Sequence, residues 1–211
     1  MKPDSKFIPY GLHEIDEDDI SEVTKALRSN YLTSGPYTKK FEKAFAKYVD
    51  AKYAVVCSSG TAALHLASLS INLDQKSSVI VPSISFLATA NAPHYTGAEI
   101  IFADVDPISG LVTPKTFVEA IKRSNNKIKA VYIVHLNGNS ADMISISKIA
   151  QKHNIIIIED ACHALGTNIV NKKKVGSCEF STISTFSFHP VKTIAMGEGG
   201  VVTTNDKKIY E

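Results

Sequence analysis

The sequence predicts an α/β fold, a three-layer sandwich in which helices cover both faces of a mixed, mostly parallel β-sheet. Short apolar runs alternate along the chain with segments of helical periodicity, the pattern of repeated βαβ units. The runs are nearly continuous in apolar residues, which is typical of strands buried on both faces. With 211 residues and 44% hydrophobic content, the chain is long enough to bury a large core.

Two surface helices are expected first, over residues 16–28 and 38–49, separated by the turn LTSGP. The expected strands are YAVVC from Tyr53, SVIVP from Ser78, EIIFADV from Glu99, KAVYIVHL from Lys129, NIIIIED from Asn154, STISTFSF from Ser181 and GGVVTTN from Gly199. Helices are expected between them over residues 62–71, 87–95, 114–124 and 142–153. Thr113 followed by Pro114 is a favourable cap and first-turn pair.

The charge balance gives no reason to expect nucleic acid or a membrane surface as a partner. Basic residues number 23 and acidic residues 21, for a net charge of +2. The start MKPDSKFIPYG lacks the apolar core of an export signal, and no apolar run is long enough to span a bilayer. Three cysteines without metal or redox spacing, Cys57, Cys162 and Cys178, predict a reduced, cytoplasmic protein with no metal site.

A small-residue turn, SSGTAALHLA, joins the first expected strand to a helix. A helix is expected to begin near Thr61, so that free backbone N–H groups and the helix dipole point at one spot, which would suit a phosphate at residues 59–62. Ordinary capping by Ser59 or Thr61 is, for this motif alone, about twice as probable. No Gly-x-Gly-x-x-Gly or Walker lysine accompanies the turn, so a standard dinucleotide or P-loop site is not expected.

The segment IIIIEDACHALG places two acids, Glu159 and Asp160, where a buried strand emerges at its carboxyl end. Open α/β sheets bind ligands at that edge, and an acid there can hold a cationic ring nitrogen. A capping role for the aspartate is equally compatible with the motif. His163 is close enough in sequence to contact the same ligand, although a lone histidine is more often a structural hydrogen-bonding residue.

Two further side chains follow strand ends. Phe86, in PSISFLATANAP, could stack on a planar ligand, whereas core packing accounts for about three in four isolated phenylalanines. Lys192, in STFSFHPVKTIAMGEGG, could act as a nucleophile if burial or neighbouring charges ease its deprotonation. Most lysines are instead solvated surface charges.

Together these weak signals describe one ligand, pyridoxal 5′-phosphate. Its phosphate would lie at residues 59–62, its ring beside Phe86, its ring nitrogen at Asp160 and its aldehyde within reach of Lys192. The carboxylate keeps the ring nitrogen protonated, so that the ring can accept electrons when a substrate carbon loses a proton. A nucleotide-dependent oxidoreductase on a similar sheet is disfavoured by the missing glycine fingerprint.

The sequence resembles the DegT/DnrJ/EryC1/StrS sugar aminotransferases, which have the fold type I architecture of aspartate aminotransferase. The resemblance runs from IPYGLHEIDEDDI through LTSGP, SSGTAALHLA, PSISFLATANAPHYTGAEIIFADVD, VHLNGNSADM and EDACHALG to SFHPVKTIAMGEGGVVTTND. It implies that Lys192 binds the cofactor aldehyde covalently and carries the proton, and that Asp160 pairs with the ring nitrogen. It further implies ring contacts from Phe86 and His163, and phosphate contacts from Gly60, Thr61, Ala62 and Ser187.

The resemblance also implies a reaction, the transfer of an amino group from L-glutamate to a UDP-linked 4-keto-6-deoxy sugar by a homodimer. A lysine at 192, where dehydratase relatives carry histidine, favours transamination. Family members are close to twice this length, so residues 1–211 are expected to form an N-terminal segment and most of the cofactor-binding large domain, without the small C-terminal domain. A catalytically incomplete remnant or split-gene fragment is the alternative.

Overall fold

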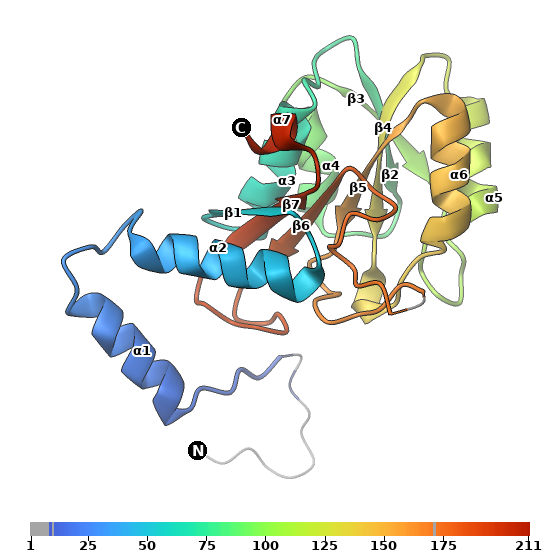
Figure 1. Cartoon of the computed structure of the whole chain (residues 1–211). Helices are drawn as coiled ribbons and strands as arrows, with labels where there is room; N and C mark the ends of the chain where they lie inside the picture. The colour runs from blue at the N-terminus through green and yellow to red at the C-terminus, as the bar shows by residue number, and fades with distance from the viewer. Residues whose placement is uncertain (1–8, 10, 171) are drawn as a thin grey trace.

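A computed structural model describes residues 9, 11–170 and 172–211 and places a seven-stranded sheet at their centre (Figure 1). The strands are β1 (Tyr53–Cys57), β2 (Ser78–Pro82), β3 (Glu99–Ala103), β4 (Ile128–Val134), β5 (Ile156–Asp160), β6 (Ile183–Ser187) and β7 (Gly200–Thr204). Their order across the sheet is β1-β7-β6-β5-β4-β2-β3. Each strand corresponds to one of the apolar runs that the sequence singles out. The ends of β1 and β2 match their runs, β4 begins one residue before its run, and the other runs extend one or two residues beyond a strand end.

The sheet is mixed and mostly parallel, as predicted. The strands from β3 to β6 pair in parallel, whereas β7 is antiparallel to both of its neighbours, β6 and β1. Consequently β1 and β6 run in the same direction, and the carboxyl ends of six strands meet at one edge. This edge is where an open α/β sheet binds its ligand.

The helices are α1 (Glu17–Leu27), α2 (Pro36–Val49), α3 (Gly60–Ser70), α4 (Leu87–His94), α5 (Pro114–Arg123), α6 (Met143–His153) and α7 (Lys207–Tyr210). A 3-10 turn, η1, covers Leu136–Gly138. The predicted cap of α5 is confirmed, because the Thr113 side chain accepts a hydrogen bond from the N–H of Thr116. The start of α2 lies two residues before the predicted one, because Pro36 occupies the first helical turn, where its missing N–H costs nothing.

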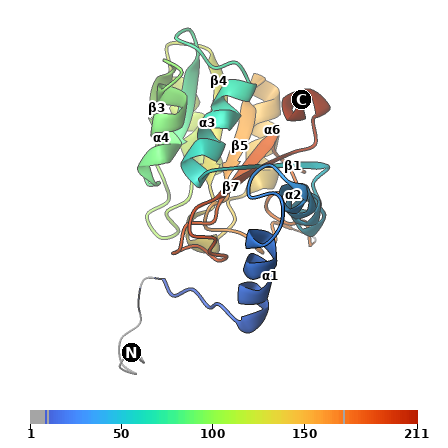
Figure 2. The same ribbon diagram turned by 90° about the vertical axis from the view of Figure 1, so that its left-hand side faces the viewer.

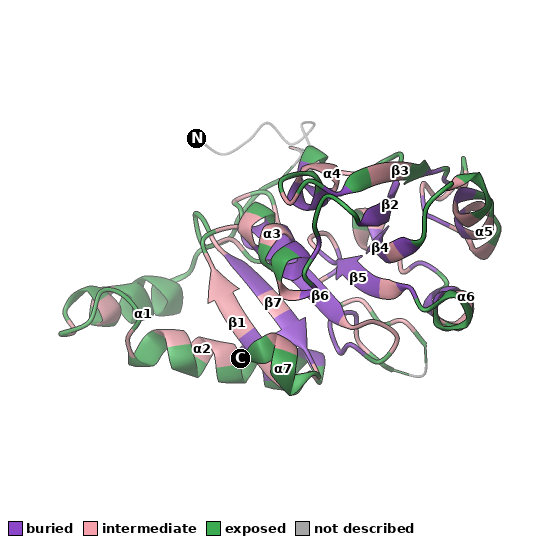
Figure 3. Cartoon of the chain, turned by 90° about the horizontal axis from the view of Figure 1, so that it is seen from above, coloured by how far each residue is buried: buried purple, intermediate pink, exposed green. Residues whose placement is uncertain are grey.

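Helices cover both faces of the sheet, which confirms the three-layer arrangement (Figure 2). One face packs against α3 and α4, and the other against α5 and α6, with α2 beside them over β6 and β7. Figure 3 shows the central strands buried along most of their length. In β2 the consecutive side chains of Val79, Ile80 and Val81 are all fully buried, which explains why this run is continuously apolar.

The two N-terminal helices differ from each other in burial. No residue of α1 is buried, and Figures 1 and 2 show this helix standing away from the sheet, so its prediction as a surface helix is confirmed. Most residues of α2 are likewise exposed, but its last two turns bury Phe45, Ala46 and Val49 in the core. The Phe45 ring meets that of Phe186 edge-on, with centroids 5.0 Å apart. None of the helices in the described residues combines the length and hydropathy needed to cross a membrane.

Candidate cofactor site

Strands β1, β7 and β6 bring two of the predicted segments together at the carboxyl edge of the sheet. Gly200 of β7 pairs with Cys57 at the end of β1 and with Ser187 at the end of β6. A Cβ atom at Gly200 would lie 2.2 Å from the Ser59 carbonyl oxygen. Only glycine therefore allows this close approach of β7 to the turn that begins α3.

The first turn of α3 combines a side-chain cap with free backbone donors. Ser59 is the N-cap, and its hydroxyl accepts a hydrogen bond from the N–H of Ala62 at 3.1 Å. Internal helical hydrogen bonding starts where the N–H of Ala63 donates to the Ser59 carbonyl at 3.0 Å. The N–H groups of Gly60 and Thr61 precede that bond, so they are the pair oriented toward an anion. Capping by Ser59 is thus compatible with a phosphate site. It uses the N–H of Ala62, so that the N–H groups of Gly60 and Thr61 are the ones available to a phosphate.

Gly60 brings the α3 turn against the end of β6. A Cβ atom at Gly60 would lie 2.6 Å from the Cβ of Ser187, 3.1 Å from its hydroxyl and 3.2 Å from the Cys162 sulfur. The Ser187 hydroxyl therefore lies beside the first helical turn, as the resemblance implies for a phosphate-binding serine. Two backbone donors, one hydroxyl and a helix N-terminus form a cradle that matches a phosphate group in shape and charge.

We expect the substitution Gly60→Ala to weaken binding of pyridoxal phosphate about tenfold or more, because the new methyl group displaces Ser187 and the α3 turn. Calorimetric titration of the chain with pyridoxal phosphate measures the change. Gly199→Ala is the matched control, since the nearest atom to its added Cβ is at 3.4 Å, an ordinary contact. Equal affinities for the two variants would show that the cradle is not the phosphate site.

Asp160 lies at the end of β5 with 5% of its surface exposed. Its Oδ2 accepts a hydrogen bond from the Thr89 hydroxyl at 2.7 Å, and its Oδ1 accepts one from the N–H of Cys162 at 3.2 Å. The second bond is the local turn contact that a capping role predicts. The first comes from α4, across the sheet edge, and fixes the carboxylate in a way that local capping does not require.

Lys192 and His163 lie near this carboxylate. Lys192 is partly buried in the loop between β6 and β7, where its N–H donates to the His189 carbonyl at 2.8 Å. Burial lowers the pKa of His163, the positive charge of Lys192 lowers it further, and the negative charge of Asp160 opposes both. Burial also raises the pKa of the Cys162 thiol, and Asp160 raises it further. His163 is therefore near enough to Lys192 and to Asp160 for both charges to influence its pKa.

Phe86 is predicted to stack on the flat ring of the ligand. It is the N-cap residue of α4 and is 71% exposed, so the core-packing alternative is wrong. It lies directly beyond β2, at the same sheet edge as Asp160. An exposed aromatic there is free to stack on a planar ligand.

Sequence reasoning missed Thr89, the buried partner of Asp160. Its sequence signal is the position three residues after Phe86, in the first turn of the helix that follows β2. A hydroxyl at that position faces the same sheet edge as the strand end before it. Only the neighbouring strands show which acid it meets, because the two residues are 71 positions apart.

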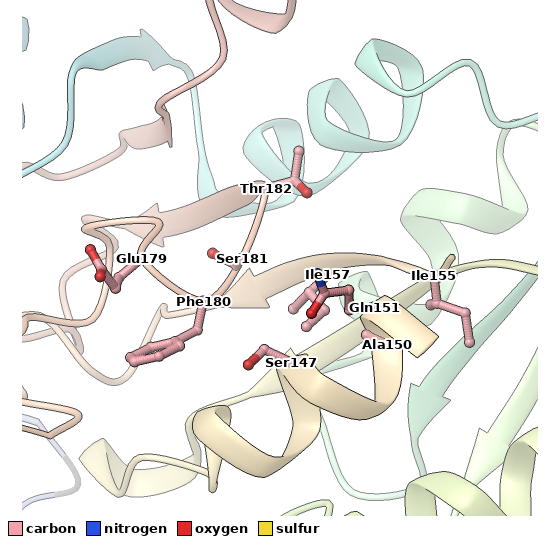
Figure 4. Close-up of a pocket in the computed structure, with 9 residues that line it drawn as sticks. All are labelled: Ser147, Ala150, Gln151, Ile155, Ile157, Glu179, Phe180, Ser181 and Thr182. Carbon is pink, nitrogen blue, oxygen red and sulfur yellow. The ribbon is translucent and has the colours of Figure 1, made fainter. Parts of the chain in front are cut away.

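Two pockets lie away from Asp160. Figure 4 shows one of about 350 Å³, where Ser147, Ala150 and Gln151 of α6 face the segment of residues 179–182. It lies toward the amino ends of β5 and β6, opposite the proposed ligand edge. A second, more apolar groove of about 410 Å³ runs between α1, α2 and the loop before β7. Neither pocket is lined by Gly60, Asp160 or Lys192.

The residues at the carboxyl edge fit pyridoxal phosphate. The α3 turn and Ser187 offer donors for a phosphate dianion, and the buried Asp160 offers an acceptor for a protonated ring nitrogen. Lys192 offers an amine on the loop that follows Ser187 and β6. This donor set, with one anion cradle and one buried acid, matches the two charged ends of that cofactor.

The chain is similar to sugar aminotransferases over most of its length. It is 41% identical to the UDP-4-amino-4,6-dideoxy-N-acetyl-beta-L-altrosamine transaminase of Campylobacter jejuni, over 96% of this chain and 52% of that protein. It is 40% identical to the GDP-perosamine synthase of Escherichia coli O157:H7, over 98% of this chain and 55% of that protein. The chain thus spans about half the length of these curated relatives.

The fold is also similar to that of a putative sugar aminotransferase from Streptococcus pneumoniae, solved in PLP and PMP forms. The TM-score to the PLP form is 0.87 at 26% identity, covering 96% of this chain and 54% of that one. Residues 13–211 match the DegT/DnrJ/EryC1/StrS aminotransferase family. By that match, and by the sheet and ligand edge described above, the chain belongs to this family.

Proposed function

We propose that this chain binds pyridoxal 5′-phosphate and forms the cofactor-binding part of an aminotransferase acting on a nucleotide-linked sugar. The observation that carries the proposal is the buried Asp160 carboxylate, fixed by the Thr89 hydroxyl at the same sheet edge as Ser187 and the N-terminus of α3. An acid fixed by a buried hydroxyl and a lysine on an adjacent loop are the two groups that transamination chemistry requires.

Each proposed site residue has a distinct role. The N–H groups of Gly60 and Thr61, together with Ser187 and the turn at Ala62, hold the phosphate. Asp160 holds the proton of the ring nitrogen, His163 contacts the ring hydroxyl, and Phe86 covers one face of the ring. When bound, the cofactor supplies an aldehyde for a lysine and a ring that accepts electrons. Lys192 Nζ binds that aldehyde and moves a proton during the reaction.

As the substrates we propose L-glutamate as the amino donor and a UDP-linked 4-keto-6-deoxy sugar as the acceptor, for surface polysaccharide or glycan precursors. The similarity to the Campylobacter jejuni transaminase supports the UDP-linked sugar. The name of the similar Escherichia coli protein specifies a different nucleotide, GDP. We further propose a cytoplasmic homodimer, with residues 1–211 forming an N-terminal segment and most of the large domain.

A second candidate is a catalytically incomplete remnant or split-gene fragment that folds and binds the cofactor without completing transamination. The chain covers about half of the length of each of these relatives. The two candidates share the cofactor site and differ in turnover.

We expect the chain to absorb as a lysine-bound pyridoxal species after incubation with pyridoxal phosphate, and borohydride reduction should leave the label on Lys192. Peptide mapping locates the label, and unlabelled Lys192 would overturn the cofactor proposal. Adding L-glutamate then separates the two candidates. A spectral change to the pyridoxamine form shows a working half-reaction, whereas an unchanged spectrum favours the remnant.

A further inference from the structure

A buried acid next to Asp160 is not used by the chemistry proposed above. Glu159 has 0% of its surface exposed and is the residue before Asp160 in β5. Because side chains alternate along a strand, Glu159 faces the α5 and α6 side of the sheet while Asp160 faces α4. A buried carboxylate is costly unless hydrogen bonds compensate its lost hydration.

Three donors converge on the Glu159 carboxylate. His135 Nε2 lies 2.7 Å from Oε2, and the hydroxyls of Ser184, at 2.9 Å, and Ser181 donate to Oε1. His135 Nδ1 accepts a hydrogen bond from the N–H of Ala141 at 3.2 Å, so its proton lies on Nε2, which donates to the acid. Burial alone raises the pKa of Glu159, but the hydrogen bonds from His135 and the two serines hold it below the usual value.

These donors come from both strands that flank β5. His135 directly follows β4, whereas Ser184 belongs to β6 and Ser181 precedes it. A backbone hydrogen bond also joins the ends of β4 and β5, because the N–H of His135 donates to the Asp160 carbonyl at 3.2 Å. The Thr185 hydroxyl donates to the Glu159 carbonyl at 3.2 Å. The Glu159 side chain therefore ties the carboxyl ends of β4 and β5 to the first half of β6, at the residue where Asp160 emerges.

We propose that Glu159 is a positioning residue for Asp160, holding the end of β5 so that the Asp160 carboxylate reaches the ring nitrogen of the cofactor. This inference rests on the proposed function. Glu159 touches no reacting group, since it lies on the opposite face of the sheet. Its contribution is geometric, because any shift of the β5 end moves Asp160 away from Thr89 and from the ring.

The substitution Glu159→Gln tests this role because it keeps the side-chain length and offers one acceptor oxygen where three donors converge. The probes are pyridoxal phosphate and its deaza analogue, in which carbon replaces the ring nitrogen. Both probes carry the same phosphate and aldehyde, and only the first can bond Asp160. The ratio of their dissociation constants therefore reports on Asp160 alone, whereas a general loss of stability weakens both probes equally.

In the unaltered chain we expect pyridoxal phosphate to bind at least about tenfold more tightly than the deaza analogue, the size of one hydrogen bond to a charged group. In Glu159→Gln this preference should fall to about one. Glu179→Gln is the matched control, because it removes the same charge from an exposed acid paired with Lys173, and its preference should stay unchanged. In an Asp160→Asn background, Glu159→Gln should cause no further change in the ratio.

The outcomes separate the two proposals. If the unaltered chain binds neither probe, the proposed function fails and this inference fails with it. If the chain prefers pyridoxal phosphate and Glu159→Gln keeps that preference, Glu159 is structural and only this inference fails. Should Glu159→Gln not fold, Ser184→Ala removes one donor and should give a smaller fall in the same ratio. The backbone N–H of Ala161 donates to the Thr185 carbonyl. Its hydrogen exchange should also be faster in the cofactor-free Glu159→Gln chain than in the cofactor-free unaltered chain.

Discussion

A chain in which Lys192 is replaced by alanine should take up no pyridoxal phosphate in borohydride-stable form. The reason is chemical, because the reduced link needs a primary amine at the aldehyde. Lys192 lies on the loop that follows β6, the strand whose carboxyl end is at the ligand edge. Mass spectrometry of the reduced chain measures the effect, and we expect loss of essentially all specific label.

The control for this experiment is an exposed lysine of the same chain. Lys207 of α7 has a side chain that is 70% exposed and pairs with Glu211 at 3.2 Å. Lys207→Ala should retain full labelling at Lys192. Equal labelling of the Lys192→Ala and Lys207→Ala chains would mean that attachment is non-specific and that Lys192 does not bind the cofactor.

The substitution Glu159→Ala should lower the free energy of unfolding by about 3 to 5 kcal/mol at pH 7, the usual cost of removing one partner from a buried charged cluster. It leaves the His135 N–H and two serine hydroxyls without their acceptor. Since domains are stable by only about 5 to 15 kcal/mol, this loss is large. Urea unfolding of the cofactor-free chain measures it.

The difference in free energy of unfolding between the unaltered chain and Glu159→Ala should depend on pH. Hydrogen bonds hold the pKa of folded Glu159 below its ordinary value of 4.5, so the carboxylate stabilises the fold above pH 4.5. That contribution is lost as the pH falls below 4.5 and through the folded pKa, and the advantage over Glu159→Ala should shrink there. The exposed control Glu179→Ala should differ from the unaltered chain by less than about 0.5 kcal/mol at pH 7. A gap that widens on acidification would contradict a charged Glu159.

Most of the sheet could be predicted from the sequence because its strands are buried on both faces and read as separate apolar runs. The run GGVVTTN indicates a strand, but it does not indicate that β7 lies between β1 and β6, antiparallel to both. That position depends on Gly200 meeting the backbone of Ser59, a contact between distant parts of the chain. The burial of Phe45 in α2 was missed for a similar reason, since this side chain packs on the distant Phe186.

The candidate site could likewise be predicted only in part from the sequence. Asp160, Ser187 and the α3 turn follow strand ends, so their common edge could be inferred from the strand pattern. Thr89 and His135 could not be assigned partners, because each meets an acid that only the folded sheet brings near. Sequence reasoning noted Glu159 only as the neighbour of Asp160. Its burial among three donors is visible only once β4 and β6 flank β5.

The position of β7 also determines when the site can form during synthesis. β1 lies at the sheet margin, and its strand neighbour is β7. The N–H of Lys52, just before β1, donates to the side chain of Asn205, which is 153 residues later. In a growing polypeptide, β1 and the α3 turn therefore lack their partner strand until β7 has left the ribosome. Because such distant pairing is slow, the phosphate cradle should mature only after β7 has been synthesised and has paired with β1.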